Sequence, residues 1–286
     1  RALRGCAVLR VFQVTGALPA VAARRRWGVP FVTTYGFWYA RLARTPLTRV
    51  LRAWVERVAL AAADAVIVTT PELGAHVRAR HPRADVHLIP NGVDTDRFRP
   101  RARPPGGERR LLYVGRLSPE KNLGALVEAA GKLSGRFSLR VTLVGDGPAR
   151  ADVEARARAL RVPLEVRPFV DHAQVPAVLA AADVFVLPSL TEGHPKILLE
   201  AMACGLPCVA SAVGGSRAIV ADGESGLLFP PDDAGALAAA VERVLAQEGL
   251  ARALGERARA EVVAHYGLAA LVGREIALLR RVAGRR

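Results

Sequence analysis

The segment LRVTLVGDGPARADVEARARAL, residues 139–160, holds a strand, a tight turn and a helix in one short unit. Its first six residues are mostly apolar, Gly145 marks the turn, and residues 149–160 have helical spacing. Similar units precede and follow this one from residue 111 onward. Such alternation predicts an α/β fold with a parallel sheet, because parallel strands need a crossover connection that is usually a helix.

In the second half of the chain we expect strands at residues 111–114, 139–144, 164–167, 184–187 and 207–210, with helices at 123–133, 149–160, 175–182, 195–203 and near 216–221. The turn-rich residues 222–231 precede a helical end. The first ninety residues show a shorter version of the pattern, with strands at 7–14, 30–34, 65–69 and 86–89 and helices at 17–26 and 47–63. This half has no opening βα unit and therefore looks incomplete.

The two halves are separated by a stretch that is rich in arginine, proline and glycine, a composition typical of a linker. We therefore expect a partial first domain at residues 1–92, a linker at 93–110 and a second domain at 111–265. A final helix at 266–286 is expected to cross back to the first domain. The chain does not begin with methionine, which predicts that it belongs to a longer protein.

Composition restricts the classes of function. The net charge is +15, and three of the 41 basic residues are lysines, which leaves 38 arginines. These arginines are scattered and not interleaved with aromatic residues, so nucleic-acid binding is a weak interpretation. A basic module that binds membranes or nucleic acid stays open as an alternative. The sequence contains no uncharged apolar stretch of about 18 residues, so we expect no membrane-spanning helix. Three cysteines are too few for a disulfide framework, and this favours a reducing cytoplasm.

The segment TEGHPKILLEAMA, residues 191–203, is typical of a loop that leads into a helix. Pro195 suits the first helical position, because proline has no amide hydrogen to leave unpaired. The next amides, those of Lys196, Ile197 and Leu198, would then point out of the helix N-terminus. That end of a helix binds phosphate groups.

Two carboxylates flank this predicted phosphate site. Glu192 lies in the loop before the helix, and Glu200 lies within it. One acid could bind sugar or phosphate hydroxyls and the other a ribose, so the layout suits a nucleotide sugar. A solvated loop acid beside a helix-surface acid is the alternative.

A second candidate phosphate site follows the strand at 111–114. Gly115 permits close approach of a ligand, Arg116 offers a planar fork of donors and Lys121 a point charge. Ligands bind beyond the carboxyl ends of the strands in open α/β sheets. We therefore expect this basic loop and the residue 195 helix to clamp one pyrophosphate.

Other candidate motifs are weaker. Gly145 and Gly147 imitate a dinucleotide fingerprint, but the third glycine is replaced by Arg150, so we expect no nicotinamide cofactor. Asp94 and Asp96 follow a turn and suit capping roles better than metal binding. We find no cluster with metal-ligand spacing, and we predict neither a metal nor a cofactor.

Together these motifs resemble the retaining GT-B glycosyltransferases of family four, the group 1 glycosyl transferases. The matching stretches are IPNGVD (89–94), VGRLSPEKN (114–122), VGDGP (144–148), ADVFVLPS (182–189) and residues 192–209. They come in the family's order and spacing. Glu192 and Glu200 match the family's Glu-x7-Glu pattern.

The resemblance implies two Rossmann-like parallel-sheet domains that face a cleft, with the donor site in the second domain. It implies catalytic roles for Arg116 and Lys121 at the donor diphosphate and for Glu192 near the transferred sugar. It also implies donor-binding roles for Gly115, Phe169, Val170, Gly193, His194, Ile197, Leu198 and Glu200. Among these, Glu200 matches the acid that binds ribose, and Phe169 and Val170 lie where the family lines its base pocket.

The predicted activity is transfer of a sugar from a nucleoside diphosphate sugar to an acceptor hydroxyl, with retention of configuration and without a metal. The acceptor would be a carbohydrate or a lipid-linked molecule. The chain departs from the family on the acceptor side: the opening glycine-rich loop is absent, and Tyr35-Gly36 stands where a histidine is common. A donor-binding fragment without transferase activity therefore stays open.

We expect a cytoplasmic location, with peripheral contact at the inner face of the membrane as one version of it. The amphipathic helix at 47–63 could make that contact. Packing of its apolar face in the core is the favoured interpretation.

Overall fold

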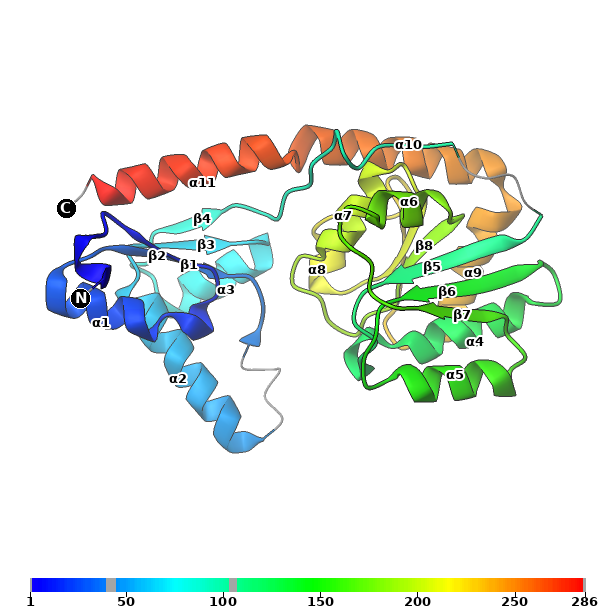
Figure 1. Ribbon diagram of the computed structural model, residues 1–286, viewed down its shortest axis with the longest axis horizontal. Helices are drawn as coiled ribbons and strands as arrows, with labels where there is room; N and C mark the ends of the chain where they lie inside the picture. Colours follow the sequence, from blue (N-terminus) through cyan, green and yellow to red (C-terminus); the bar gives the residue numbers. More distant parts are fainter. Residues whose placement is uncertain (1, 40–44, 103–106, 285–286) are drawn as a thin grey trace. The chain divides into compact units, whose positions relative to one another are not determined.

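The computed structural model describes residues 2–39, 45–102 and 107–284 and divides into two compact units (Figure 1). Unit 1 comprises Arg1–Asn91 and Ala269–Arg286, and unit 2 comprises Gly92–Leu268. Each unit contains one sheet in which every pairing is parallel. The predicted α/β class with two parallel sheets is confirmed.

The sheet of unit 2 has the strand order β10-β9-β8-β5-β6-β7. Its strands are β5 (Arg109–Val114), β6 (Leu139–Val144), β7 (Leu164–Arg167), β8 (Val184–Leu187), β9 (Cys208–Ser211) and β10 (Leu227–Phe229). The order reverses between β5 and β8, where Leu112 pairs with Phe185 on one side and Thr142 on the other. Such a reversal is the topological switch point at which open α/β sheets bind ligands.

Helices cover both faces of this sheet, which explains why its central strands are continuously apolar. They are α4 (Leu123–Leu133), α5 (Arg150–Ala159), α6 (Val175–Ala180), α7 (Lys196–Ala203), α8 (Gly214–Arg217), α9 (Ala234–Ala246) and α10 (Glu248–His265), with a short 3-10 turn at Pro119–Lys121. In Figure 1, α4, α5 and α9 lie on one face, and α7 and α10 lie on the other.

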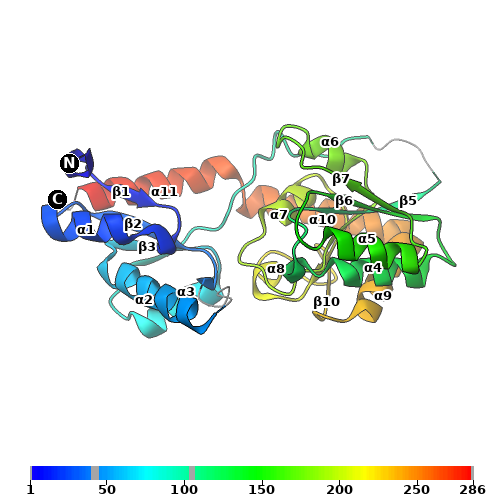
Figure 2. The same cartoon turned by 60° about the horizontal axis from the view of Figure 1, so that its bottom comes forward.

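Unit 1 has the strand order β1-β2-β3-β4. Its elements are 3-10 turns at Ala2–Gly5 and Val14–Gly16, the strands β1 (Leu9–Val11), β2 (Phe31–Tyr35), β3 (Ala65–Val68) and β4 (Val86–Leu88), and the helices α1 (Leu18–Trp27), α2 (Pro46–Ala62), α3 (Pro71–Arg80) and α11 (Leu268–Ala283). The core on one face joins β2 and β3 to α1, α2 and α3, whereas α11 covers the other face (Figure 2). Leu271, Leu278 and Val282 of α11 pack against Val32 and Ile67.

The structure differs from the sequence prediction in several elements. The first strand is shorter than residues 7–14, and α3 and β10 have no predicted counterpart. The polarity of α3 hides its periodicity, although Thr70 caps it by accepting a hydrogen bond from the Leu73 amide at 3.2 Å. The first part of the predicted linker packs on unit 2, because Phe98 is 1% exposed and the Val93 amide donates to Tyr266.

The prediction that the helix at 47–63 buries its apolar face is wrong for the first half of α2. Val55, Ala59 and Leu60 are buried, but Val50 and Trp54 are exposed by 67% and 53% of their surface. Figure 1 shows this half of α2 extending away from the sheet of unit 1. None of the described helices is long and apolar enough to cross a membrane.

Candidate functional site

The predicted site residues of unit 2 gather on the loops that leave the carboxyl ends of its strands. The loop after β5 and the loop after β8 are neighbours because the strand order reverses between them. A backbone hydrogen bond of 2.9 Å joins the two loops, from the Leu190 amide to the Glu120 carbonyl. The fold therefore places the basic loop beside the loop that carries Glu192.

Glycines let the loops after β5 and β6 touch through their backbones. A Cβ on Gly145 would lie 2.0 Å from the Gly115 carbonyl oxygen, and one on Gly147 would lie 2.3 Å from that of Leu117. Gly115 itself has a φ of 151°, which an L side chain rarely adopts. The Gly-x-Gly pattern thus serves loop packing, and this close packing holds the basic loop in place.

Lys121 and Glu192 form an ion pair at the centre of the site. The Lys121 Nζ donates to Glu192 Oε1 at 2.6 Å, and Ser189 Oγ donates to the same oxygen at 2.6 Å. Only 21% of the Lys121 side chain and 10% of the Glu192 side chain are exposed. Lys121 has three N–H groups, so donors remain for an anionic ligand after this bond is made.

Arg116 is the exposed member of the basic pair. Its side chain is 67% exposed, and Nη2 lies 2.9 Å from Glu120 Oε1. Partial burial acts to raise the pKa of Glu120, but hydrogen bonds from Ser118 and Arg116 outweigh it and lower that pKa. The Arg116 carbonyl accepts a bond from the hydroxyl of Tyr113, whose pKa is raised by burial, so the backbone of the loop is anchored while the guanidinium stays in solvent.

Helix α7 begins one residue later than predicted. Pro195 is the cap residue with extended backbone, and Lys196 is the first helical residue. The Leu198 amide donates to the Pro195 carbonyl at 3.2 Å, and the Leu198 side chain is fully buried. The predicted free amide of Leu198 is therefore wrong, and the amides of Lys196 and Ile197 are the ones that precede the first bond of the turn.

Glu200 lies in the second turn of α7 and is 3% exposed. Its Oε1 is 2.7 Å from Nε2 of His172, whose side chain is half exposed and whose ring packs 5.3 Å from that of Phe98. His172 belongs to none of the sequence motifs that predict site residues. Its position could have indicated a role in the site, because His172 lies two residues after Val170, in the predicted base-pocket segment.

Gly193 packs against helix α8, which follows β9, and His194 packs against Tyr266. A Cβ on Gly215 would lie 2.5 Å from the Gly193 carbonyl oxygen, so only glycine fits there without a shift. His194 is buried, which lowers the pKa of its imidazole to about 4, and its ring lies 5.7 Å from that of Tyr266. A neutral imidazole therefore lies directly before the α7 N-terminus at pH 7.

The two predicted base-pocket residues differ in exposure. Phe169 is 62% exposed, and its ring approaches the Gly145 position closely enough to lie 3.4 Å from a Cβ built there. Val170 packs against the core of unit 2. Of these two residues, Phe169 is the one with an exposed side chain beside the loop after β6.

Comparison with known proteins decides the family. The profile of "Glycosyl transferases group 1" matches residues 94–261, and that of "Glycosyltransferase Family 4" matches residues 10–97. The chain belongs to the group 1 glycosyl transferases. It is 32% identical to an alpha-D-kanosaminyltransferase of Streptomyces kanamyceticus over 83% of this chain, and 33% identical to a D-inositol 3-phosphate glycosyltransferase of Geodermatophilus obscurus over 82%. It spans 65% and 58% of the lengths of these two relatives.

Solved structures place this group 1 glycosyl transferase in the GT-B fold. A sucrose-phosphate synthase from Thermosynechococcus elongatus is 29% identical, with a TM-score of 0.90 over 99% of this chain and 75% of that chain. Anabaena HepE in complex with UDP-glucose has a TM-score of 0.86 over 98% of this chain and 80% of that one. HepE is 18% identical, so this second likeness shows the fold alone.

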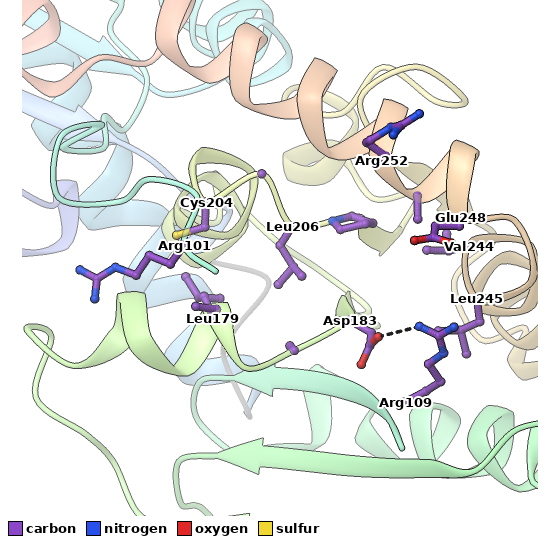
Figure 3. A pocket seen from close by; sticks show the side chains of 15 residues that line it. Arg101, Arg109, Leu179, Asp183, Cys204, Leu206, Val244, Leu245, Glu248 and Arg252 are labelled. Carbon is purple, nitrogen blue, oxygen red and sulfur yellow. Dashed lines mark hydrogen bonds and ion pairs between the residues drawn. The ribbon is translucent and has the colours of Figure 1, made fainter. Parts of the chain in front are cut away.

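A hollow of unit 2 lies away from the candidate site (Figure 3). It has a volume of about 440 Å³ and is lined by Arg101, Arg109, Asp183 and Cys204, among others. Arg109 and Asp183 pair at 3.3 Å where β5 and β8 begin. This is the amino-terminal edge of the sheet, whereas α/β sheets bind ligands at the carboxyl edge.

Within residues 2–39, 45–102 and 107–284, no group of three or more His, Cys, Asp or Glu side chains could hold a metal ion. That the protein needs no metal stays a prediction.

Proposed function

We propose that this group 1 glycosyl transferase moves a sugar from a nucleoside diphosphate sugar to an acceptor hydroxyl, with retention of the anomeric configuration. The bond between the sugar C1 and the diphosphate breaks, a bond between C1 and the acceptor oxygen forms, and the proton of the acceptor hydroxyl passes to the departing diphosphate. The observation that carries the proposal is the Lys121–Glu192 pair. It brings a cation and an acid from two separate loops together at the switch point of the sheet.

The charge that develops on the leaving diphosphate would meet three kinds of donor. Lys121 supplies N–H groups from a largely buried position, and Arg116 supplies an exposed planar fork. The amides of Lys196 and Ile197 add the positive end of α7. Donors aimed at developing charge in a site that excludes water are the largest source of catalysis in many enzymes.

Glu192 would then have two tasks. In the free protein it neutralises Lys121 and keeps that side chain in place. In the donor complex it would bind hydroxyls of the transferred sugar, while Ser189 holds its carboxylate in the same orientation. The buried Glu200, oriented by His172, would accept hydrogen bonds from the ribose, and Phe169 would stack on the base.

The relatives bear the names of different transferases, so the names do not define one acceptor for this chain. We propose a carbohydrate or lipid-linked acceptor and a cytoplasmic location with peripheral contact to the inner membrane face.

The test pairs binding with turnover. Calorimetry with UDP, GDP and ADP identifies the nucleotide, and release of that nucleotide from its sugar conjugates in the presence of acceptors measures transfer. The control variant is Lys132→Ala, because Lys132 is an exposed lysine on α4. The donor site is supported if Lys121→Ala binds the nucleotide about tenfold more weakly and Lys132→Ala binds it as the wild type does. Nucleotide binding without turnover by any donor and acceptor pair would indicate a donor-binding fragment. Absence of binding by all three nucleotides contradicts the proposal.

A further inference from the structure

Unit 1 contains a hollow between two of its helices. α2 and α3 pack on the face of the sheet toward which Phe31 and Tyr35 point, and the hollow lies between them (Figure 2). It has a volume of about 490 Å³, within the range of roughly 300–1,000 Å³ that is usual for small-molecule sites. Its lining includes Tyr35, Trp38, Glu56, Arg57, His76 and Arg80. We call it the α2–α3 hollow.

The side chains that line the α2–α3 hollow come from one face of each helix. On α2 they are residues 53, 56, 57 and 60, and on α3 they are residues 76 and 80. Spacings of three and four residues put side chains on the same face of a helix. β2 ends at Tyr35, and the loop that follows it carries Trp38. Three segments of the chain therefore converge on one hollow.

One wall of the α2–α3 hollow is aromatic. The His76 ring stacks on the Tyr35 ring, with the centroids 5.7 Å apart and the planes inclined by 5°. The Trp38 ring meets the His76 ring edge-on, at 4.2 Å between centroids. Tyr35 is buried, whereas Trp38 and His76 are partly exposed. Because the three rings pack on one another, the wall is formed before any ligand binds.

Charged groups of both signs also line the α2–α3 hollow. Glu56 is 9% exposed, and a carboxylate has about four positions at which it accepts hydrogen bonds. Arg57 and Arg80 are exposed. Arg80 contacts the His76 ring, 3.1 Å from its Nε2, and none of the residues that the structure describes forms a hydrogen bond or ion pair with Arg57. Each guanidinium has five N–H donors, so donors remain for a ligand.

His81, at the end of α3, senses the positive charge in this hollow. Burial lowers the pKa of its imidazole, and the charges of Arg57 and Arg80 lower that pKa further. The imidazole is therefore neutral at pH 7. Both arginines lie close enough to act on this one ring, which itself lines the hollow. The α2–α3 hollow thus combines an apolar wall, a largely buried carboxylate and two neighbouring cations.

We propose that the α2–α3 hollow binds a sugar ring that carries an acidic group, either a carboxylate or a phosphate. The C–H face of the sugar packs on the Trp38 ring, and the Glu56 carboxylate accepts hydrogen bonds from sugar hydroxyls. Arg57 and Arg80 bind the acidic group, because the planar guanidinium matches the geometry of carboxylates and phosphates.

Other ligands use only part of this lining. A cation would suit Trp38 and Glu56, as in an aromatic cage, but Arg57 and Arg80 would repel it. A wholly apolar ligand would cover the Glu56 carboxylate without offering it a hydrogen-bond donor, which is costly. A free phosphate ion would leave the aromatic wall unused. An acidic sugar matches the ring wall, the carboxylate and the arginines together.

This inference is independent of the sugar-transfer proposal, because the hollow belongs to unit 1 and the donor site to unit 2. The test is calorimetry of the 286-residue chain without nucleotide. The ligands are glucose, galactose and mannose, each as the neutral sugar, the uronate and the 6-phosphate. At least one acidic sugar should bind about tenfold or more tightly than its neutral form, and its uronate or its phosphate, whichever binds more tightly, identifies the acid. Acetate and inorganic phosphate, which have no ring, should bind at least about tenfold more weakly than that sugar.

Variants separate the parts of the site. Arg57→Ala should reduce the preference for the acidic sugar about tenfold. Its matched control is Arg49→Ala, which changes an exposed arginine of the same helix outside the hollow and should bind as the wild type does. Trp38→Ala should weaken binding of the acidic sugar, whereas Trp54→Ala, on the exposed side of α2, should not. Circular dichroism and thermal unfolding check that each variant folds.

Several results would overturn the proposal. They are equal affinity for all acidic and neutral forms, equal binding by Arg57→Ala and Arg49→Ala, and inorganic phosphate or acetate that binds as tightly as the acidic sugar. Choline binding that Trp38→Ala abolishes would indicate a cation site instead. Lys121→Ala keeps the two proposals apart: lost affinity for the acidic sugar would place that sugar at the donor site and overturn the inference, whereas lost nucleotide affinity with unchanged sugar affinity supports both proposals.

Discussion

Replacing Lys121 with methionine separates the two roles of this side chain, which pairs with Glu192 in the free protein and is proposed to bind diphosphate in the complex. For binding, a charge-assisted hydrogen bond contributes about 1.5–3 kcal/mol. Its loss should weaken the affinity for the preferred nucleoside diphosphate about tenfold to a hundredfold.

The same substitution should lower the free energy of unfolding of unit 2. Removing one partner of a fully buried ion pair costs about 3–5 kcal/mol. Lys121 is 21% exposed and Glu192 keeps its bond from Ser189, so we expect a smaller loss of about 1–3 kcal/mol. Each kcal/mol should lower the melting temperature by about 2–4 °C for a domain of this size.

A double-mutant cycle with Glu192→Gln isolates the pair. The double variant should be less destabilised than the two single variants predict by addition, with a coupling of about 1–2 kcal/mol. The three tryptophans, Trp27, Trp38 and Trp54, all belong to unit 1. Tryptophan fluorescence therefore follows unit 1 as an internal control, while calorimetry reports both units.

Two results would refute this reasoning. If Lys121→Met binds the nucleotide within twofold of the wild type, Lys121 does not contact the diphosphate. If the coupling is below about 0.5 kcal/mol, the 2.6 Å contact is not a stabilising interaction in solution.

Three further changes test the surroundings of the site. Gly215→Ala puts a methyl group 2.5 Å from the Gly193 carbonyl oxygen and should lower both the melting temperature and nucleotide affinity, whereas Gly249→Ala, which meets no atom within 4 Å, should leave both unchanged; equal effects would contradict the packing argument. Burial holds the pKa of His194 at about 4 against 6.5 ordinarily, so the unfolded chain binds more protons between these values. The stability of unit 2, measured by urea unfolding, should therefore fall as pH decreases from about 6.5 towards 4, and His194→Asn should reduce that slope. Glu200→Gln should weaken calorimetric binding of the ribonucleotide more than of its 2′-deoxy and 3′-deoxy forms, and a uniform loss would show that Glu200 contacts another group.

Much of unit 2 is predictable because strong local signals agree there. The apolar strands and the turn glycines occur in regular alternation, and the bounds of β6 and α4 match the prediction. Elements with weak periodicity are missed. Helix α3 is polar on most of its surface, and β10 has only three residues within a turn-rich segment.

The candidate site shows the same division. Glycine spacing marks the loops, and the acid pattern marks Glu192 and Glu200. His172 carries no comparable signal, because its importance comes from a carboxylate 28 residues away in the sequence. The position of Leu198 near the start of the helix predicts a free amide, but that amide donates a hydrogen bond to the Pro195 carbonyl.

The sequence by itself determines the parallel α/β class, the loops that follow each strand and the amphipathic character of α2, because these properties depend on periodicity and turn chemistry within a few residues. Only the tertiary structure decides that Lys121 meets Glu192 across 71 residues. Only the tertiary structure, likewise, shows which side of α2 faces the core. Periodicity defines the angle between two faces of a helix, but packing against the rest of the chain selects the face that is buried.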